Sequence, residues 1–329
     1  MIHKVMRILF YLSLSIPLQT QELSGELVLK SFQHTFPHKA GEAVFKDGDW
    51  TIRVGEETFY WARGRLLPAA LKNNWESYRP QIFSRYPRDI PDPASYTGEE
   101  IEELRGQGSR EARLDREDPY IGFQAALYGG MTRVEIETHQ VKAVFLGKNI
   151  VIHEDIVEAL DRAERGIKAL AQEDPEIAAF IASIDSIGGY NWRQIQGTRR
   201  MSSHSWGLAL DIQPKRLGNK VMYWFWERIF NDNWMIVPLE RRWIPPLGVV
   251  RVFEREGFIW GGKWALYDNM HFEYRPELHE VNRLLADEAY NPGSAQNRDA
   301  PDLHHLYPTR LPRKGSLFHR ILVYLGLKK

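Results

Sequence analysis

Cysteine is absent from this chain of 329 residues. Its absence excludes disulfides, thiolate nucleophiles and cysteine-rich zinc sites. Histidine and carboxylate side chains are therefore the metal ligands to look for in this sequence.

The chain also lacks net charge. Its 43 lysine and arginine residues balance 43 aspartate and glutamate residues, so the composition predicts no nucleic-acid partner. Apolar residues make up 43% of the chain and aromatic residues 12%, which is enough for a sizeable core. The length allows two domains, or one domain with large additions.

The apolar run near the start is too short for a transmembrane helix. Residues 8–18 follow the basic residues His3, Lys4 and Arg7, but a bilayer-spanning helix needs about 20 apolar residues. This pattern predicts a signal peptide or N-terminal anchor over residues 1–22, and hence export to the periplasm or cell envelope. The following Gln19-Thr20-Gln21 lacks a small-x-small cleavage site, so an uncleaved anchor or a buried first helix stays an alternative.

Residues 23–137 form an N-terminal region of unknown role. Residues 43–54 place two β-prone runs around Asp47-Gly48, which predicts a β-hairpin. Residues 58–61 are expected to add a third strand. Residues 99–118 are dense in charges of both signs, which is typical of a solvated helix or a mobile linker.

Residues 138–290 are expected to form an α+β domain, with a small, mostly antiparallel sheet and flanking helices. The spacing predicts strands over residues 141–152. Carboxylates at Glu154 and Asp155 favour a helix start there. Further helices are predicted from Pro175 to near Gly188, over residues 221–230 and 247–256, and from Pro276 onward.

Residues 291–329 form a C-terminal tail. Residues 310–329 carry six basic side chains and no acidic one, interspersed with apolar residues. Such an amphipathic segment can dock on the domain surface or make peripheral contact with an anionic membrane.

The most informative motif is Ser202-Ser203-His204-Ser205-Trp206-Gly207-Leu208-Ala209-Leu210-Asp211, followed later by Asp268-Asn269-Met270-His271. It contains the side chains of a hydrolytic metal site: two imidazoles, a carboxylate ligand and a second carboxylate that can act as a base. Three protein ligands leave a fourth position open for water. Alternation predicts a strand that carries Asp211 on the same face as the small Ala209, while Gly207 permits an unusual dihedral or a close backbone approach.

These motifs resemble the D-alanyl-D-alanine carboxypeptidase family of zinc peptidases, which includes carboxypeptidases of vancomycin resistance and L-alanyl-D-glutamate endolysins. The resemblance rests on Ser202-x-His204-x-x-Gly207-x-Ala209-x-Asp211, on residues 257–264 leading into Asp268-Asn269-Met270-His271-Phe272-Glu273, and on Gly188-Gly189-Tyr190-Asn191-Trp192-Arg193. It covers about residues 140–290, and it implies the Hedgehog/DD-peptidase-like fold.

The resemblance implies a role for each site residue. His204, Asp211 and His271 would bind Zn²⁺, and Asp268 would act as the general base. Arg193 would stabilise negative charge or hold a substrate carboxylate, although the neighbouring Arg199 and Arg200 are alternatives. The remaining expected roles are substrate contact by Ser202, Arg199 and Trp206, and orientation of a metal ligand by Glu273. Stabilisation of its own loop is an equal alternative for Ser202, and tryptophans are more often core residues.

The expected function is therefore hydrolysis of the peptide stems of bacterial peptidoglycan. The expected bond is either the terminal D-Ala-D-Ala bond or an internal bond of the L-Ala-D-Glu type. A non-catalytic cell-wall or protein-binding module that keeps the peptidase fold is the alternative, because such a module needs the fold but not a complete site.

Overall fold

The computed structural model describes residues 23–81, 83–114 and 119–289. The predicted signal peptide or anchor and the predicted basic tail lie outside these residues. Within the described ranges, no helix combines the length and apolar character needed to cross a membrane.

The N-terminal region forms a helix and a four-stranded antiparallel sheet in the order β1-β2-β3-β4. Its elements are α1 (Gly25–Thr35), β1 (Val44–Lys46), β2 (Asp49–Val54), β3 (Glu57–Tyr60) and β4 (Leu67–Pro68). Asp47 and Gly48 both have positive φ, 55° and 78°, as a two-residue hairpin turn between twisted strands requires. The predicted hairpin and third strand are confirmed.

Aromatic packing holds α1 against this sheet. Phe123, from α4 (Gly122–Tyr128), lies edge-on to Phe32 of α1 and to Phe59 of β3, with ring centroids 4.9 and 5.2 Å away. Phe59 and Ile52 are fully buried. The first strands therefore join the protein's main core.

The charge-dense segment is largely helical. It forms α2 (Gly98–Gln107) and α3 (Arg110–Leu114), and residues 115–118 lie outside the described ranges. Thr97 and Glu100 form a capping box at the start of α2, which satisfies the free backbone N–H groups of the first turn. Of the two predicted alternatives, the solvated helix is confirmed for the described part.

The next segment follows the predicted pattern except at one helix end. After α5 (Arg133–Glu137) come β5 (Gln140–Phe145), β6 (Lys148–His153), α6 (Val157–Glu173) and α7 (Pro175–Ser183). The prediction that the helix from Pro175 continues to Gly188 is wrong. The chain instead becomes extended at Ile184 and forms β7 (Ile184–Gly188), because these residues pair with β8 and bury Ile184 and Ile187.

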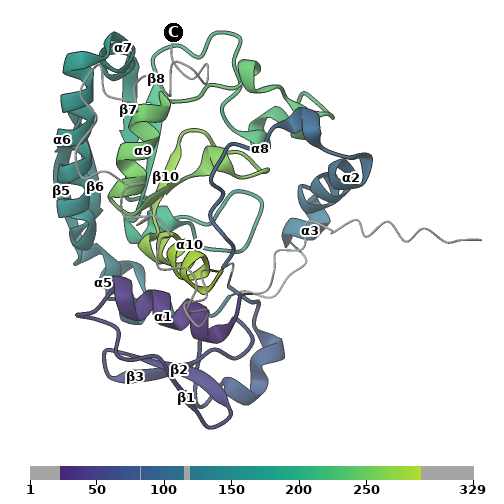
Figure 1. The fold of residues 1–329 in the computed structure, drawn as a ribbon, viewed down its shortest axis with the longest axis vertical. Helices are drawn as coiled ribbons and strands as arrows, with labels where there is room; N and C mark the ends of the chain where they lie inside the picture. Colours follow the sequence, from purple (N-terminus) through teal and green to yellow (C-terminus); the bar gives the residue numbers. More distant parts are fainter. Residues whose placement is uncertain (1–22, 82, 115–118, 290–329) are drawn as a thin grey trace, which may run out of the picture. The chain divides into compact units, whose positions relative to one another are not determined.

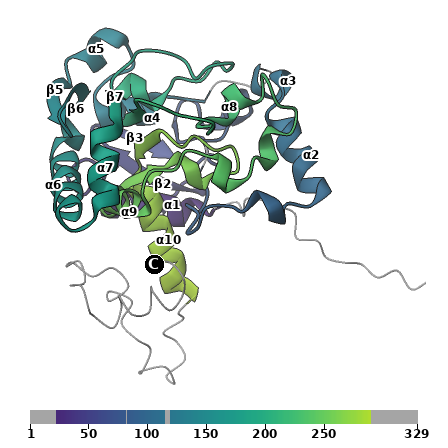
Figure 2. The ribbon, with the colours of Figure 1, turned by 90° about the horizontal axis from the view of Figure 1, so that it is seen from above.

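A second four-stranded antiparallel sheet carries the motif residues, in the order β7-β8-β10-β9. Its other strands are β8 (Ala209–Pro214), β9 (Phe258–Trp260) and β10 (His271–Tyr274), and α9 (Leu247–Arg255) and α10 (Pro276–Ala289) follow the predicted helices. Figures 1 and 2 show α6, α7 and α9 gathered on one side of this sheet. The α+β fold class is confirmed.

The predicted helix over residues 221–230 shortens to α8 (Trp224–Glu227). The prediction is wrong at its start, because Val221 and Tyr223 form β-bridges with Arg242 and Asp268. The backbone there pairs with other segments and cannot also make helical hydrogen bonds. Short 3-10 turns complete the described structure at η1 (Lys72–Ser77), η2 (Pro93–Ser95), η3 (Glu154–Ile156), η4 (Ser203–Trp206), η5 (Trp234–Ile236), η6 (Leu239–Arg241) and η7 (Gly261–Lys263).

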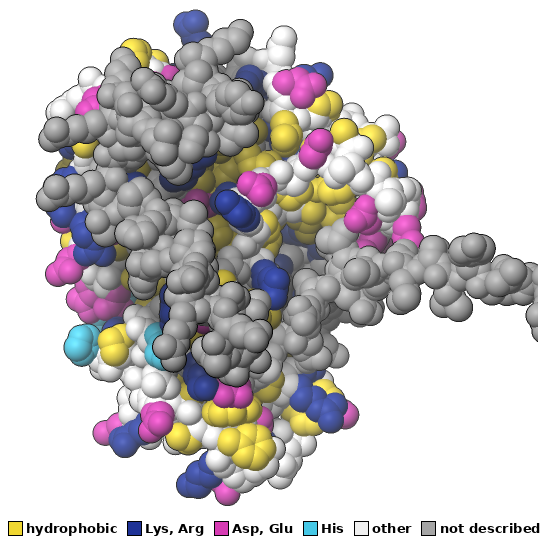
Figure 3. All heavy atoms as spheres, viewed as in Figure 1, with side chains coloured by type: hydrophobic (Ala, Val, Ile, Leu, Met, Phe, Trp, Pro, Cys, Tyr) yellow, Lys and Arg dark blue, Asp and Glu magenta, His cyan; other side chains and the backbone are white. Residues whose placement is uncertain are grey.

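The N-terminal region and the motif sheet share one hydrophobic core, which includes Phe59 as well as Phe272. Tyr86 adds polar contacts between them. Its hydroxyl donates to Glu254 Oε1 at 2.6 Å and accepts from the Trp260 N–H at 2.9 Å. The predicted boundary at residues 137/138 therefore does not separate two cores. On the described surface visible in Figure 3, acidic and basic side chains are interspersed.

Candidate metal centre and active site

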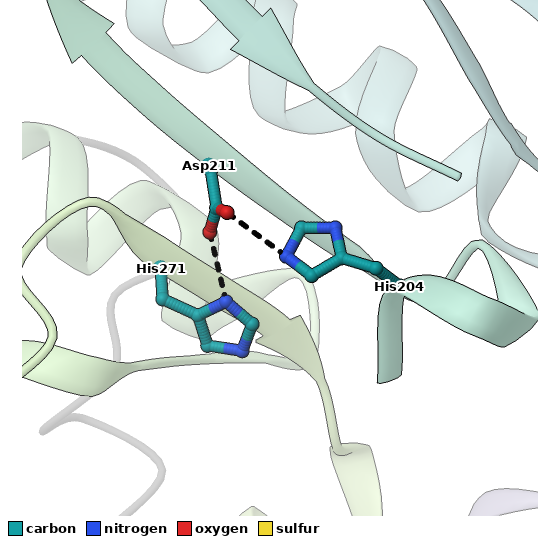
Figure 4. Close-up of side chains that lie close together, drawn as sticks. All are labelled: His204, Asp211 and His271. Atoms are coloured by element: carbon teal, nitrogen blue, oxygen red, sulfur yellow. Dashed lines mark hydrogen bonds and ion pairs between the residues drawn. The ribbon is translucent and has the colours of Figure 1, made fainter. Parts of the chain in front are cut away.

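His204, Asp211 and His271 converge, as predicted, although they come from three segments of the chain (Figure 4). Asp211 on β8 and His271 on β10 are direct cross-strand partners, so their side chains share one face of the sheet. His204 arrives from η4. One ligand atom from each residue lies within 4.8 Å of the other two.

Gly207 lets η4 approach the hairpin formed by β5 and β6. Its φ is +69°, and an added Cβ would lie 2.1 Å from Gln140 Oε1 and 2.6 Å from the His153 nitrogen. A side chain at this position would therefore collide with backbone, and the positive φ also disfavours one. Both predicted reasons for this glycine are confirmed.

The neutral ring of His204 has a lone pair on Nε2 that is available to a metal ion. Its Nδ1 lies 2.7 Å from the Gly189 carbonyl oxygen, which can only accept, so Nδ1 carries the hydrogen and Nε2 has the lone pair in the neutral ring. Nε2 is buried without a hydrogen bond, 3.2 Å from Asp211 Oδ2. Two facing acceptors repel unless a proton or a metal cation lies between them, so this arrangement can accommodate a divalent metal.

His271 is oriented by carboxylates on both sides. Its Nδ1 lies 2.9 Å from Asp211 Oδ1, and its Nε2 lies 3.4 Å from Glu273 Oε2. A proton on Nε2 directed at Glu273 leaves Nδ1 free to bind metal. The two nitrogens and one oxygen of this cluster are the donor set of catalytic zinc sites, and the predicted place of Glu273 beside His271 matches the structure.

The ionisable groups of the cluster lie close enough together to shift one another's pKa. Burial opposes ionisation of Asp211, but its interactions with His204 and His271 outweigh burial and hold its pKa well below the usual range. Burial also opposes protonation of His271, yet the contacts with Asp211 and Glu273 hold its pKa well above normal. Against its burial, Glu273 has its pKa lowered to about 2, chiefly by His271. The site is therefore built to attract positive charge.

Asp268 lies in the turn that leads into β10. Its carbonyl accepts from the His271 N–H at 3.2 Å, and its own N–H donates to the Gly261 carbonyl at 3.1 Å. A Cβ at Gly261 would lie 2.5 Å from the Asp268 carbonyl oxygen, so only glycine fits there. Asp268 Oδ1 is buried without a hydrogen bond, and burial raises the pKa of the carboxyl to about 7. A carboxylate with this pKa suits proton transfer near neutral pH.

Arg193 is the arginine of its segment that reaches the ligand cluster. One guanidinium nitrogen lies 3.9 Å from Asp211 Oδ2, and the side chain is 40% exposed. For Arg199, the described residues show only a backbone hydrogen bond from the Gln194 side chain to its carbonyl oxygen, and the residue is exposed. The geometry favours Arg193 for the electrostatic role.

Two residues predicted to contact substrate lie inside the protein. The Ser202 hydroxyl accepts from the His204 N–H at 3.4 Å, and Ser202 is 4% exposed, so it supports the ligand loop. Trp206 is 3% exposed and packs in the main core. This burial contradicts the predicted substrate contact of Trp206, because its indole has no open face.

Two groups that support the site were not predicted from the sequence. The Ser205 hydroxyl donates to the Arg193 carbonyl at 2.8 Å and accepts from the Arg193 N–H at 3.1 Å. It therefore fastens the arginine segment to the ligand loop. The Gly189 carbonyl fixes the His204 tautomer, but backbone atoms leave no residue-type pattern.

Comparisons with known families agree with this geometry. Residues 196–274 match the family model described as D-alanyl-D-alanine carboxypeptidase, and this match contains all three ligand residues and Asp268. Residues 28–83 match the model of a domain of unknown function. No curated protein and no solved structure gives a match. The carboxypeptidase match supports a peptidase of that family for this part of the chain.

Proposed function

We propose that this protein is a zinc-dependent peptidase that hydrolyses the peptide stems of peptidoglycan. The observation that carries the proposal is the convergence of His204, Asp211 and His271, whose acceptor atoms face one another. Asp268 lies three residues before His271 in the chain. The family match over residues 196–274 supports the same conclusion.

His204 Nε2, His271 Nδ1 and an Asp211 oxygen would hold the metal. When bound, a zinc ion would act as a Lewis acid and lower the pKa of water towards ~7. Asp268 accepts a proton from the attacking water and then delivers it to the leaving amine. Burial raises the pKa of this carboxyl to about 7, so it can both accept and release a proton near neutral pH.

Arg193 supplies fixed positive charge at the edge of the site. Attack on a peptide carbonyl builds negative charge on its oxygen, and a guanidinium beside the ligands stabilises that charge. The 40% exposure of Arg193 also lets it bind a carboxylate that enters from solvent. Both roles suit peptidoglycan stems, which carry free carboxylates.

The substrate lies outside the cytoplasm, so the proposal includes export to the periplasm or cell envelope, directed by residues 1–22. The bond is either the terminal D-Ala-D-Ala bond or an internal L-Ala-D-Glu bond. In the resembling family an aspartate at the base position occurs in endopeptidase-type members, which favours the internal bond slightly.

Purified stem peptides of both kinds, incubated with zinc-loaded protein, test this proposal. Mass spectrometry of the products should show either loss of one alanine or two internal fragments, which identifies the bond. Arg193→Lys is a matched variant that keeps the charge and loses the bidentate fork, and it should lower the rate. Binding of the peptides without any cleavage would instead support the non-catalytic binding module.

A further inference from the structure

The N-terminal region reaches the candidate active site through α3. Figure 2 shows α3 near α8, and side-chain contacts of Arg113 join the two helices. The guanidinium of Arg113, on α3, lies over the rings of Trp224 and Phe225, 4.9 and 4.5 Å from their centroids. Arg113 also donates to the carbonyl of Gln196, in the segment that follows Arg193.

Tyr223 lies directly across from Asp268. The two residues form an antiparallel bridge, flanked by hydrogen bonds from Trp224 N to Tyr267 O and from Asn269 N to Met222 O. Tyr223 and Asp268 are therefore a non-hydrogen-bonded pair, the type whose side chains lie closest together on one face. The tyrosine side chain thus starts on the same face as the proposed base.

The Tyr223 hydroxyl has a proton available for donation. The Arg113 guanidinium lies over the ring of Phe225, whose centroid is 6.0 Å from that of Tyr223. A guanidinium can only donate hydrogen bonds, so Arg113 cannot take the phenol proton. Asp268 Oδ1 has no hydrogen bond, so it does not take this proton.

The surroundings keep this hydroxyl neutral, so it retains a proton that it can donate in a hydrogen bond. Burial raises the pKa of Tyr223 to about 12, with the Asp268 charge adding to the effect. Arg113 and Arg193 both act on the phenol from nearby, and positive charge beside a phenol oxygen polarises its O–H bond. A neutral donor next to Arg193 is the kind of group that stabilises a developing oxyanion.

We propose that the Tyr223 hydroxyl is a catalytic hydrogen-bond donor to the substrate carbonyl oxygen, and that Arg113 is a positioning residue that holds this phenol. The inference rests on the proposed peptidase function and assigns a role to the N-terminal region, which completes the active-site wall through α3. No covalent bond forms or breaks at Tyr223, because the hydroxyl keeps its proton throughout.

Tyr223→Phe tests this proposal, because it removes the hydroxyl and keeps the aromatic ring, whose centroid lies 5.4 Å from that of Trp226. We expect kcat on the cleaved stem peptide to fall about 10²–10³-fold, with little change in KM or zinc affinity. Tyr60→Phe is the matched control, since it removes a hydroxyl that donates to Asp47 in the N-terminal sheet, and it should keep the wild-type kcat.

Arg113→Met and the double variant distinguish positioning from a merely structural role. Arg113→Met should lower kcat less than Tyr223→Phe, and Arg113→Lys should recover part of that loss. Because Arg113 acts through Tyr223, the double variant should be no slower than Tyr223→Phe alone. If Tyr223→Phe does not fold, the Arg113 variants still decide, because their kcat must fall while their zinc affinity stays constant.

The outcomes separate the two proposals. A wild type that cleaves stem peptides and a folded Tyr223→Phe with equal kcat would overturn the role of Tyr223 alone. A wild type that cleaves no stem peptide when loaded with zinc would reject the peptidase function, and this inference with it.

Discussion

The two four-stranded sheets of this protein differ in how their residues come together. The N-terminal sheet is a meander in chain order, β1-β2-β3-β4, whereas the motif sheet has the order β7-β8-β10-β9 and pairs His271 with Asp211 across sixty residues of chain. Most buried positions of the first sheet, such as Ile52 and Phe59, are apolar, although the buried Thr51 is polar. The second sheet instead places a histidine and an aspartate side by side.

One hydrophobic core therefore holds both an apolar sheet and a sheet that carries ionisable side chains. A charged pair such as Asp211 and His271 is costly to bury unless its charges are compensated. The N-terminal sheet adds apolar packing to the same core that includes the motif sheet. Deletion of residues 23–137 would therefore expose the core as well as remove Arg113, and point substitutions are the sharper test of each region.

The largest effect should follow removal of a metal ligand. His204→Ala leaves two ligands and should abolish zinc binding and peptidase activity together, because a catalytic zinc site needs three protein ligands. Metal analysis of the purified protein and a hydrolysis assay measure both. His34→Ala removes a 41% exposed histidine that pairs with Glu280, and it should keep both properties. Full activity in His204→Ala would exclude this cluster as the catalytic centre.

Asp268→Asn should lower kcat by about 10²–10⁴-fold, the usual contribution of a general base. In the wild type, kcat/KM should fall as the pH drops below about 7, because protonation of Asp268 removes the base. A bound metal ion favours the ionised carboxylate, so it moves this fall to a lower pH. The pH–rate profile measures this fall. An unchanged profile in the Asn variant would assign the fall to another group.

The same substitution should stabilise the metal-free protein. The folded-state pKa of Asp268 lies above the ordinary aspartate value of 3.8, so this carboxyl lowers the free energy of unfolding as pH rises from about 4 to about 7. Urea unfolding of the metal-free protein at pH 5 and pH 8 should show that Asp268→Asn loses less stability with pH than the wild type. Equal losses would contradict the burial of this charge.

Phe59→Ala tests whether the first sheet supports the second. Removal of this fully buried ring should cost about 3–5 kcal/mol of unfolding free energy. Because both sheets share one core, fluorescence and zinc release should report a single unfolding transition. Two separate transitions would show that the N-terminal region folds as an independent unit.

Glu273→Gln should weaken zinc binding about 10–100-fold, as loss of a group that orients a ligand does. The amide keeps the size of the side chain but lacks the charge that holds a proton on His271 Nε2. Competition against a chromophoric chelator measures the affinity. Wild-type affinity in the variant would mean that Glu273 does not orient the ligand.

The smallest effects on stability are expected from two glycine substitutions, one in each region. Gly48 has φ +78° and open space around its Cβ position, so Gly48→Ala should cost only about 1–2 kcal/mol and leave activity intact. Gly207→Ala adds a collision with the His153 backbone to a similar φ. It should cost more stability and also weaken zinc binding, because Gly207 ends the turn that carries His204. Thermal unfolding and chelator competition distinguish the two.

Local patterns allowed the candidate ligands His204 and Asp211 and the first hairpin to be predicted, whereas the third candidate ligand, His271, came from a second motif sixty residues later. Asp47-Gly48 specifies its turn through two positive φ angles, and His204, Gly207 and Asp211 lie within one short motif. The helix α6 was also readable, from carboxylates at its start and an apolar stripe. These features depend on neighbours in the chain, so the sequence alone indicates them.

Long-range contacts decided what sequence reasoning missed. The helix from Pro175 ends early because residues 184–188 pair with β8, and Tyr223 leaves its predicted helix because its backbone pairs with Asp268. Trp206 lies in the core rather than against substrate. Arg113 lies over the rings of Trp224 and Phe225 only because α3 packs against α8, which no local pattern encodes.

The most direct test of the central claim is zinc-dependent cleavage of a stem peptide. Metal-free wild type and Asp268→Asn would each be titrated with zinc, while product formation is followed by mass spectrometry. We predict that wild-type activity rises until one zinc is bound per chain, and that Asp268→Asn binds the same amount of zinc with little activity. Cleavage that persists in the metal-free wild type, or no cleavage after zinc binding, would contradict the proposed mechanism.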